Sequence, residues 1–404
     1  MFGGASRWLW AIVAAGTVAR LVVAALTEGL AFDVESFAVV RRALADDPLE
    51  VYGTVGLYRW PYPPGFFGWI ELAAGLERAT GVAFVNWVQL APIAADAGLA
   101  LLVAWYLRRR GLGERVALAG AALVAFGPSF LLISGYAVQI DSVAILPAAA
   151  ALVVWERGGR SAGDAGRPSG WVGADGRAWQ AGLLIGLAAA IKTVPVLMLL
   201  ALLPTARDRR EALVLVACAV AVPVALLSPF LLADPHGVWR LRDYKGIPGM
   251  GGLTLVVQPE LAERWLTNPV GPNAINRWIA GHSTLVNLLA IGPVAAFLLA
   301  RRVPAPRAAA ILWLAVWAFG TGFFFQYLVW GLPFLLLAGL LRAALAVQLV
   351  AIVPAILFYR GPWEDHGVVV VFAALMIALW VGWVAGLAAL ARGAPAPRPA
   401  EAGT

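Results

Sequence analysis

The sequence predicts an all-α, polytopic integral membrane protein. Of its 404 residues, 61% are hydrophobic and only 13% are charged, whereas a soluble domain is usually about a quarter charged. Apolar stretches of roughly 20 residues recur almost to the C-terminal end, and each is long enough to cross a hydrocarbon layer of about 30 Å as a helix. These two observations favour a bundle of membrane helices over a set of soluble domains.

The apolar segments divide the chain into four expected parts. A membrane module, 1–232, includes an external loop at 28–63; a long external loop follows at 233–282, then C-terminal membrane helices at 283–392 and a flexible tail at 393–404. We expect about 11–13 membrane segments. The apolar segments lie at 8–27, 64–80, 82–107, 116–134, 142–155, 179–203, 211–232, 283–300, 308–326, 328–341, 343–359 and 367–391.

Arginine-rich loops predict the orientation of the chain, because short basic loops stay in the cytoplasm. The loops in question are Arg108–Arg110, 157–177, Arg207–Arg210 and Arg301–Arg302. The polar stretches 28–63 and 233–282 are then external, provided that the segments 64–80 and 179–203 each return to the side of the membrane on which they start. Lys192 and Pro195 would break the second of these segments. The alternative, that both segments cross fully and the charge rule fails for a loop or two, stays open.

The charged and metal-binding residue types exclude several function classes. The net charge of +7 is accounted for by cytoplasmic arginines and does not indicate nucleic-acid binding. The single cysteine, Cys218, cannot form a disulfide framework. The histidines at 236, 282 and 366 are too far apart in sequence to suggest a zinc site.

Polar and aromatic residues of the first external stretch suggest a site at the membrane surface. Asp33 and Glu35 are two residues apart, a pair able to supply a general base or to contact a metal–phosphate group, although such pairs are usually only solvated. Trp60 and Tyr62 belong to a string, 58–64, crowded with aromatics and prolines. They would anchor the chain at the membrane interface or provide stacking surfaces for a sugar.

Three further regions carry candidate polar groups. Gln139 and Asp141 lie at an external turn, where they would bond sugar hydroxyls or, alternatively, Asp141 would cap the following helix. Lys192 lies within an apolar run, where a lysine costs about 2.5–3.5 kcal/mol and needs a partner: a carboxylate such as Asp96, a carbonyl, or the phosphate of a lipid. Arg240 and Lys245 belong to a loop that would cover an anionic lipid head group, or would simply be exposed.

Taken together and in order, these features resemble the GT-C superfamily of membrane glycosyltransferases, in particular the GPI mannosyltransferase I family and its prokaryotic relatives, over about 33–333. Six strings carry the resemblance. They are Asp33-Val34-Glu35; Tyr58-Arg59-Trp60-Pro61-Tyr62-Pro63-Pro64; Asp96 with the turn Arg110-Gly111-Leu112-Gly113; Gln139-Ile140-Asp141-Ser142; Ile191-Lys192-Thr193-Val194-Pro195; and Gln326-Tyr327-Leu328-Val329-Trp330-Gly331-Leu332-Pro333.

The resemblance implies an inverting transfer of one hexose, in the first place mannose, from a polyprenyl-phosphate carrier to a lipid-linked or cell-envelope acceptor on the external face. Asp33 and Glu35 are the implied catalytic carboxylates, with Asp33 as the base. Lys192, Arg240 and Lys245 would hold the donor phosphate. The implied sugar- or acceptor-binding residues are Trp60, Tyr62, Gln139, Asp141, Gln326 and Tyr327.

The chain departs from the family pattern at two points. Its acidic motif is D-x-E where the family has D-x-D, so a divalent cation is only a candidate cofactor. An Arg-Gly-Asn pattern before Gln139 is missing, which leaves arabinofuranose or glucose as alternative sugars. A transporter or lipid flippase without chemistry is the rival class, since broken segments and buried charges also occur there; missing repeat symmetry and long aromatic external loops disfavour it.

Overall fold

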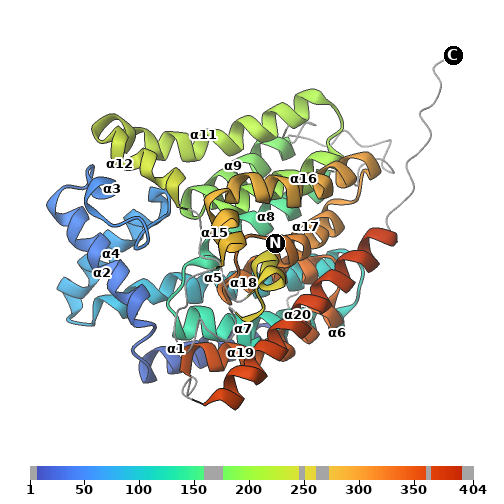
Figure 1. The fold of residues 1–404 in the computed structure, drawn as a ribbon, viewed down its shortest axis with the longest axis horizontal. Helices are drawn as coiled ribbons and strands as arrows, with labels where there is room; N and C mark the ends of the chain where they lie inside the picture. The colour runs from blue at the N-terminus through green and yellow to red at the C-terminus, as the bar shows by residue number, and fades with distance from the viewer. Residues whose placement is uncertain (1–6, 159–175, 245–250, 261–272, 361–364, 394–404) are drawn as a thin grey trace.

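The computed structural model describes residues 7–158, 176–244, 251–260, 273–360 and 365–393, and all regular structure in these residues is helical (Figure 1). Within these described residues, seven helical stretches are long and apolar enough to cross a membrane. They are α1 (Arg7–Leu26), α5 (Phe84–Arg109), the stretch Glu114–Tyr136 beginning with α6 (Glu114–Ala125), α11 (Arg209–Ala233), α16 (Ser283–Arg301), α19 (Leu341–Arg360) and α20 (His366–Arg392).

The other membrane segments expected from the sequence are shorter or interrupted helices. They comprise α8 (Asp141–Gly158), α9 (Gly176–Ile191), α10 (Met198–Leu202), α17 (Ala305–Phe319) and α18 (Gln326–Leu337). At 1.5 Å per residue, α17 and α18 measure only about 18–23 Å, too short to span alone, and they are buried in the centre of the bundle. The all-α polytopic prediction is confirmed, but 11–13 is the number of apolar segments rather than of full-length spans.

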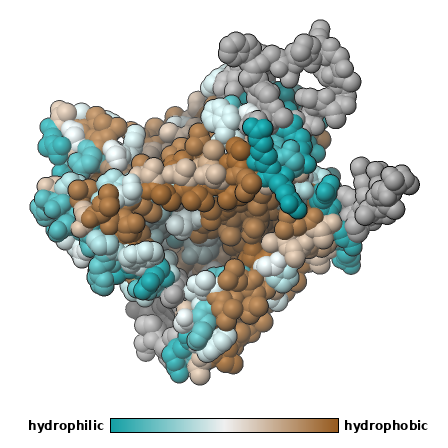
Figure 2. Space-filling model, turned by 90° about the horizontal axis from the view of Figure 1, so that it is seen from above, coloured by the Kyte–Doolittle hydropathy of each residue, from teal (hydrophilic) through white to brown (hydrophobic). Residues whose placement is uncertain are grey.

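The apolar surface agrees with a membrane location. Figure 2 shows hydrophobic residues across the middle of the face seen from above, with hydrophilic residues gathered towards the left and upper right edges. Large apolar side chains such as Leu213, Leu232 and Leu288 are mostly exposed on the outer helices α11 and α16. Exposed apolar surface between two polar ends is what the hydrocarbon layer requires of a spanning bundle.

Arg20 and Asp96 form a buried ion pair that joins the first helices of the bundle. The Arg20 Nε atom lies 2.8 Å from Asp96 Oδ2, and both side chains are 2% exposed. Asp96 also accepts hydrogen bonds from Ser134 and Ser142 at 2.5 Å each, so that α1, α5 and the start of α8 are held together. The sequence analysis considered Asp96 as a partner for Lys192, but in the structure Asp96 pairs with Arg20.

The predicted external loop 28–63 is largely helical. It contains α2 (Ala31–Asp46) and α3 (Val51–Thr54), and the following segment forms a 3-10 turn, Pro64–Phe66, and α4 (Phe67–Thr80). These elements pack around a second hydrophobic core, separate from that of the main bundle, and lie together at the left of Figure 1. With 14 residues, α4 is about 21 Å long and is too short to cross the membrane.

The segment 179–203 is broken where its sequence predicts. Helix α9 ends at Ile191, Lys192 follows it, and a 3-10 turn at Val194–Leu197 precedes α10. Helix α9 packs between α8 and α11. The stretch 233–282, which the sequence predicts to be external, contains short helices in its described residues: α12 (Pro235–Trp239), α13 (Gly252–Val257) and α15 (Ala274–Gly281).

Candidate active site

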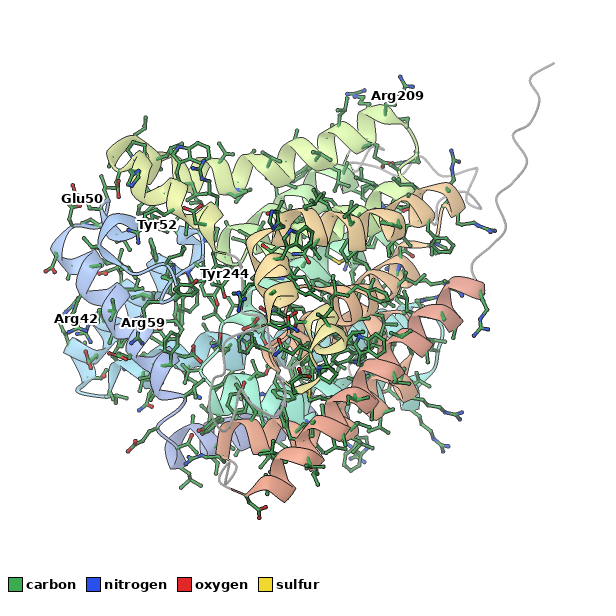
Figure 3. All side chains as sticks on the ribbon, viewed as in Figure 1. Arg42, Glu50, Tyr52, Arg59, Arg209 and Tyr244 are labelled. Atoms are coloured by element: carbon green, nitrogen blue, oxygen red, sulfur yellow. The ribbon has the colours of Figure 1, made fainter. Side chains whose placement is uncertain are left out.

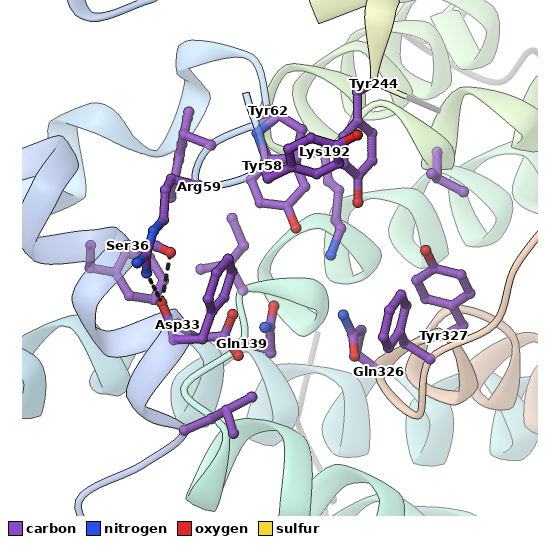
Figure 4. Close-up of a pocket in the computed structure, with 18 of the residues that line it drawn as sticks. Asp33, Ser36, Tyr58, Arg59, Tyr62, Gln139, Lys192, Tyr244, Gln326 and Tyr327 are labelled. Atoms are coloured by element: carbon purple, nitrogen blue, oxygen red, sulfur yellow. Dashed lines mark hydrogen bonds between the residues drawn. The ribbon is translucent and has the colours of Figure 1, made fainter. Parts of the chain in front are cut away.

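A cavity of about 420 Å³ lies where the helices of the second core meet the main bundle. Its walls come from segments far apart in the sequence: the start of α2, the string 58–62, the turn before α8, the break after α9, and the start of α18 (Figure 4). Polar and aromatic groups line it: Asp33, Ser36, Tyr58, Arg59, Trp60, Tyr62, Gln139, Lys192, Tyr244, Gln326, Tyr327, Trp330 and Tyr359.

Asp33 lies in the first turn of α2, where the positive end of the helix dipole favours its charge. Its Oδ2 atom is buried without a hydrogen-bond partner. Burial raises the pKa of Asp33 to about 6, and the Gln139 amide and the charge of Lys192 offset part of that rise. A buried carboxylate with a free oxygen and a pKa near 6 is well suited to accept a proton at neutral pH.

Lys192 forms a buried ion pair with Asp141 on the wall of the cavity. Its Nζ atom lies 2.7 Å from Asp141 Oδ1, and the side chains are 5% and 0% exposed. Lys192 directly follows α9, while Asp141 is the first residue of the antiparallel α8. Each charge therefore lies at the helix end that stabilises it. Trp330 Nε1 also donates to Asp141 Oδ1. Lys192 itself lines the cavity, among the residues labelled in Figure 4.

Aromatic rings surround the Lys192 ammonium group. It lies 4.8 Å from the ring centroid of Tyr62 and 5.4 Å from that of Trp330, within the range of cation–π attraction. Trp330 stacks on Tyr327 with centroids 3.8 Å apart. The 3-10 turn after Tyr62 approaches α9 so closely that a Cβ on Gly65 would lie 2.5 Å from the Ala190 carbonyl oxygen. Glycine is needed there to hold the aromatic string against Lys192.

Gln139 enters the cavity from a strained turn. A π-helical turn at Leu131–Tyr136 precedes it, and Val138 adopts a φ of 60°, a left-handed conformation that is unfavourable for a β-branched residue. Such strain is concentrated at functional sites. Gln326 faces the same space from the first turn of α18 (Figure 4).

The structure brings most of the predicted site residues together, and several lie elsewhere. Glu35 points away from the cavity and pairs with Arg59, with Glu35 Oε2 2.7 Å from Arg59 Nη2 and its side chain 58% exposed. Asp141 lies behind Lys192 and does not line the cavity. Arg240 is near the carbonyl of Gly53, outside the cavity. Lys245 lies outside the described residues.

Arg59 is a cavity residue to which the sequence analysis assigned no role. Its Nη1 atom donates to the Phe32 carbonyl at 3.1 Å, and its guanidinium lies 4.3 Å from the Phe32 ring centroid. These contacts and Glu35 hold the guanidinium beside Asp33 (Figure 4). The sequence did contain a signal for Arg59, because this residue lies inside the aromatic string 58–64. The string alone, however, does not indicate which of its side chains face the cavity.

The carboxylates of the site do not converge on a metal position. Among the described residues, no three side chains of His, Cys, Asp or Glu are grouped closely enough to hold an ion. Among the described residues, Asp33 is the one carboxylate that lines the cavity, and Glu35 is turned towards Arg59. A cation held by the D-x-E pair therefore does not fit this arrangement.

An apolar groove of about 650 Å³ adjoins the cavity and shares part of its wall. Thr193, Val194, Tyr244, Tyr327 and Trp330 line both spaces. Beyond them the groove runs between the segment after α9, α16 and α17, and its lining is largely aliphatic. The polar cavity therefore continues into a space that suits a hydrocarbon chain.

Comparisons with known proteins agree with this architecture. Residues 60–240 match the model of glycosyltransferase family 87. The fold is similar to the crystal structure of ArnT from Cupriavidus metallidurans bound to undecaprenyl phosphate, with a TM-score of 0.51 and 16% sequence identity over 96% of this chain and 78% of that one. This chain has the GT-C glycosyltransferase fold. A search of curated proteins finds no match.

The predicted all-α GT-C fold is thereby confirmed, and the family 87 match agrees with a multi-pass membrane glycosyltransferase. That match runs from the aromatic string at Trp60 to Arg240. It includes the turn with Gln139 and the break with Lys192, and ends before α18.

Proposed function

We propose that the protein transfers a hexose, in the first place mannose, from a polyprenyl-phosphate carrier to a hydroxyl group of a lipid-linked or cell-envelope acceptor. The observation that carries the proposal is the arrangement of two groups around one cavity. They are the Asp33 carboxylate, whose buried Oδ2 atom has no hydrogen-bond partner, and the buried ammonium group of Lys192. The reaction requires these two charges, one to take a proton and one to hold a phosphate.

The donor would lie with its phosphate between Lys192 and Arg59 and its lipid chain in the apolar groove. Both cations line the cavity, and Lys192 is at its junction with the groove, next to Thr193 and Val194. The similarity to a protein whose structure was solved with undecaprenyl phosphate supports a carrier of this class. The polar head and apolar tail of a polyprenyl phosphate match the two connected spaces.

The proposed chemistry is a single displacement at the anomeric carbon. The acceptor oxygen attacks that carbon and passes its proton to Asp33, while the bond from the carbon to the phosphate oxygen breaks. The electron pair of that bond leaves with the polyprenyl phosphate. Lys192 and Arg59 stabilise the charge on the departing phosphate, and aromatic faces such as Tyr62 and Tyr327 would pack against the sugar rings. Configuration at the carbon is inverted.

Asp141 has a different role in this proposal from the one that the resemblance implies. Because it is fully buried and shares its Oδ1 atom between Lys192 and Trp330, it positions the ammonium group and does not touch the sugar. Glu35 likewise holds Arg59 in place. Gln139, Gln326 and Trp60 remain candidates for contact with sugar or acceptor.

A donor panel tests the proposal. Purified protein in lipid nanodiscs is incubated with radiolabelled polyprenyl-phosphate mannose, glucose or arabinofuranose and a membrane lipid extract. We expect labelled product with one of these donors, mannose in the first place, and release of polyprenyl phosphate in equal amount. Movement of labelled donor between the leaflets of a vesicle, without any product, would instead support a transporter.

The external location of the site is part of the proposal. On a Cys218→Ala background, single cysteines at Ala45 and Leu112 are labelled in intact cells with a membrane-impermeant maleimide. Ala45 is exposed on α2, beyond Asp33, while Leu112 follows the arginine triplet at the end of α5. We expect Ala45 to react and Leu112 to react only after permeabilisation; the reverse pattern would place the site in the cytoplasm.

A further inference from the structure

A hollow lined by arginines lies on the outer side of the second core. It has a volume of about 520 Å³, and its lining consists of Ala38, Arg41, Arg42, Ala45 and Arg78; we call it the arginine hollow. The four α2 residues follow the i, i+3, i+4, i+7 spacing of one helix face, and Arg78 comes from the last turn of α4. The two alanines leave space between the arginine side chains.

The positive charge of the arginine hollow is only partly balanced. Arg41 pairs with Glu77 at 2.5 Å, and Glu77 also accepts a hydrogen bond of 2.9 Å from the backbone N–H of Phe84. Arg42 and Arg78 are exposed and make no ion pair or hydrogen bond with any described residue. Glu77 also attracts Arg78, but the Arg42 and Arg78 guanidinium groups line one open space without a hydrogen-bond partner among the described residues.

The arginine hollow lies at the depth of the lipid head groups. The Arg41 guanidinium is 4.8 Å from the ring centroid of Phe84, and Phe84 is the first residue of the membrane-spanning α5. The end of a spanning helix lies at the boundary between the hydrocarbon layer and the head groups. Leu72 of α4, 49% exposed, and Val82, 43% exposed, supply apolar surface on the same segment.

The hollow is separate from the catalytic cavity. Asp33, Ser36 and Phe37 line the cavity from one face of α2, whereas the face centred on Ala38, Arg41 and Arg42 is turned away by roughly 140° at 3.6 residues per turn. Figure 3 shows Arg42 at the outer left edge and Arg59 on the inner side. A ligand of the arginine hollow therefore does not occupy the proposed donor or acceptor position.

We infer that the arginine hollow binds the phosphate group of an anionic phospholipid from the surrounding bilayer. Guanidinium groups bind phosphate through two parallel hydrogen bonds, and a lipid at the rim of the bundle presents its phosphate at this depth. An anionic head group is favoured over a zwitterionic one, because three of the described lining residues are arginines and none is acidic; Glu77 attracts both Arg41 and Arg78 and balances only part of this charge. The bound lipid holds α2 and α4 at the membrane surface, independently of the proposed reaction.

Lipid titration of the detergent-purified full chain, followed by native mass spectrometry, tests the inference. Phosphatidylglycerol and phosphatidylcholine with the same acyl chains are compared on wild type and on the double variant Arg42→Gln/Arg78→Gln. We expect wild type to prefer phosphatidylglycerol, and the double variant to bind it about 30-fold more weakly, as for two surface arginines facing an anionic lipid. Arg209→Gln, an exposed arginine at the far end of α11 (Figure 3), is the matched control and leaves binding unchanged.

Two results would overturn the inference. One is equal binding of the two lipids by wild type, and the other is a double variant that binds phosphatidylglycerol within twofold of wild type. If the double variant does not fold, as judged by its thermal unfolding midpoint, the single variant Arg42→Gln decides the question. For that variant we expect about a fivefold loss, and no loss would contradict the proposed site.

Discussion

Replacing Lys192 by methionine should damage both stability and donor binding, and the structure shows how to separate the two effects. Lys192 and Asp141 are 5% and 0% exposed and 2.7 Å apart. Removing the lysine leaves a carboxylate buried without its counter-charge, which costs about 3–5 kcal/mol. We therefore expect Lys192→Met to lower the thermal unfolding midpoint clearly.

Replacing Asp141 as well removes the buried carboxylate that Lys192→Met leaves without a counter-charge. In Lys192→Met/Asp141→Asn the remaining amide is neutral and can still accept the Trp330 hydrogen bond, so most of the lost stability should return. Donor binding should not return, because the ammonium group that faces the cavity is gone. A charge-assisted contact to phosphate is worth about 1.5–3 kcal/mol, which corresponds to a donor affinity roughly 10- to 150-fold weaker.

The assay combines a thermal unfolding midpoint with equilibrium binding of polyprenyl-phosphate mannose on the same purified samples. Asp141→Asn alone is the control, since it keeps the lysine while removing its partner. If the double variant regains stability and also binds the donor with wild-type affinity, Lys192 is structural only. That outcome would refute its assignment to the donor phosphate.

Two further predictions concern the groups beside Lys192. Asp33 must be ionised to act as a base and its pKa is raised to about 6, so kcat/KM should rise as the pH increases through 6. At pH 5, about one tenth of the pH 8 value of kcat/KM should remain. A kcat/KM that is flat between pH 5 and 8 would contradict the assignment of Asp33 as the base. Arg59→Gln should raise the KM for the donor by at least tenfold. Glu35→Gln only removes the ion pair that holds Arg59, and it should raise this KM less than fivefold. If steady-state kinetics show an equal or larger effect for Glu35→Gln than for Arg59→Gln, Glu35 contacts the donor directly.

The sequence predicts the all-helical membrane architecture well because hydropathy is a local property, whereas the orientation that loop charge predicts stays a prediction. Lys192 could be identified as a site residue for the same reason, since a lysine in an apolar run is costly wherever the chain folds. Its partner could not be identified: Asp141 is 51 residues away in the chain, and Asp96 was an equally reasonable candidate until its pairing with Arg20 was known.

Glu35 lies outside the cavity for a structural reason. The sequence analysis treats 28–63 as a loop, in which neighbouring carboxylates can converge. In the structure, Asp33 and Glu35 lie on α2, and residues two apart on a helix point in different directions. The same helix geometry brings Ser36 and Phe37 beside Asp33, a grouping that only a helical interpretation of this segment would predict.

The rate of transfer by Asp33→Asn tests the central claim most directly. Single-turnover transfer of radiolabelled mannose from polyprenyl-phosphate mannose is compared for wild type, Asp33→Asn and Asp46→Asn, an exposed carboxylate at the other end of α2. The account predicts a loss of about 10²–10⁴ in rate for Asp33→Asn, with donor affinity kept and Asp46→Asn unaffected. A rate for Asp33→Asn above one tenth of wild type would contradict the claim that Asp33 is the base.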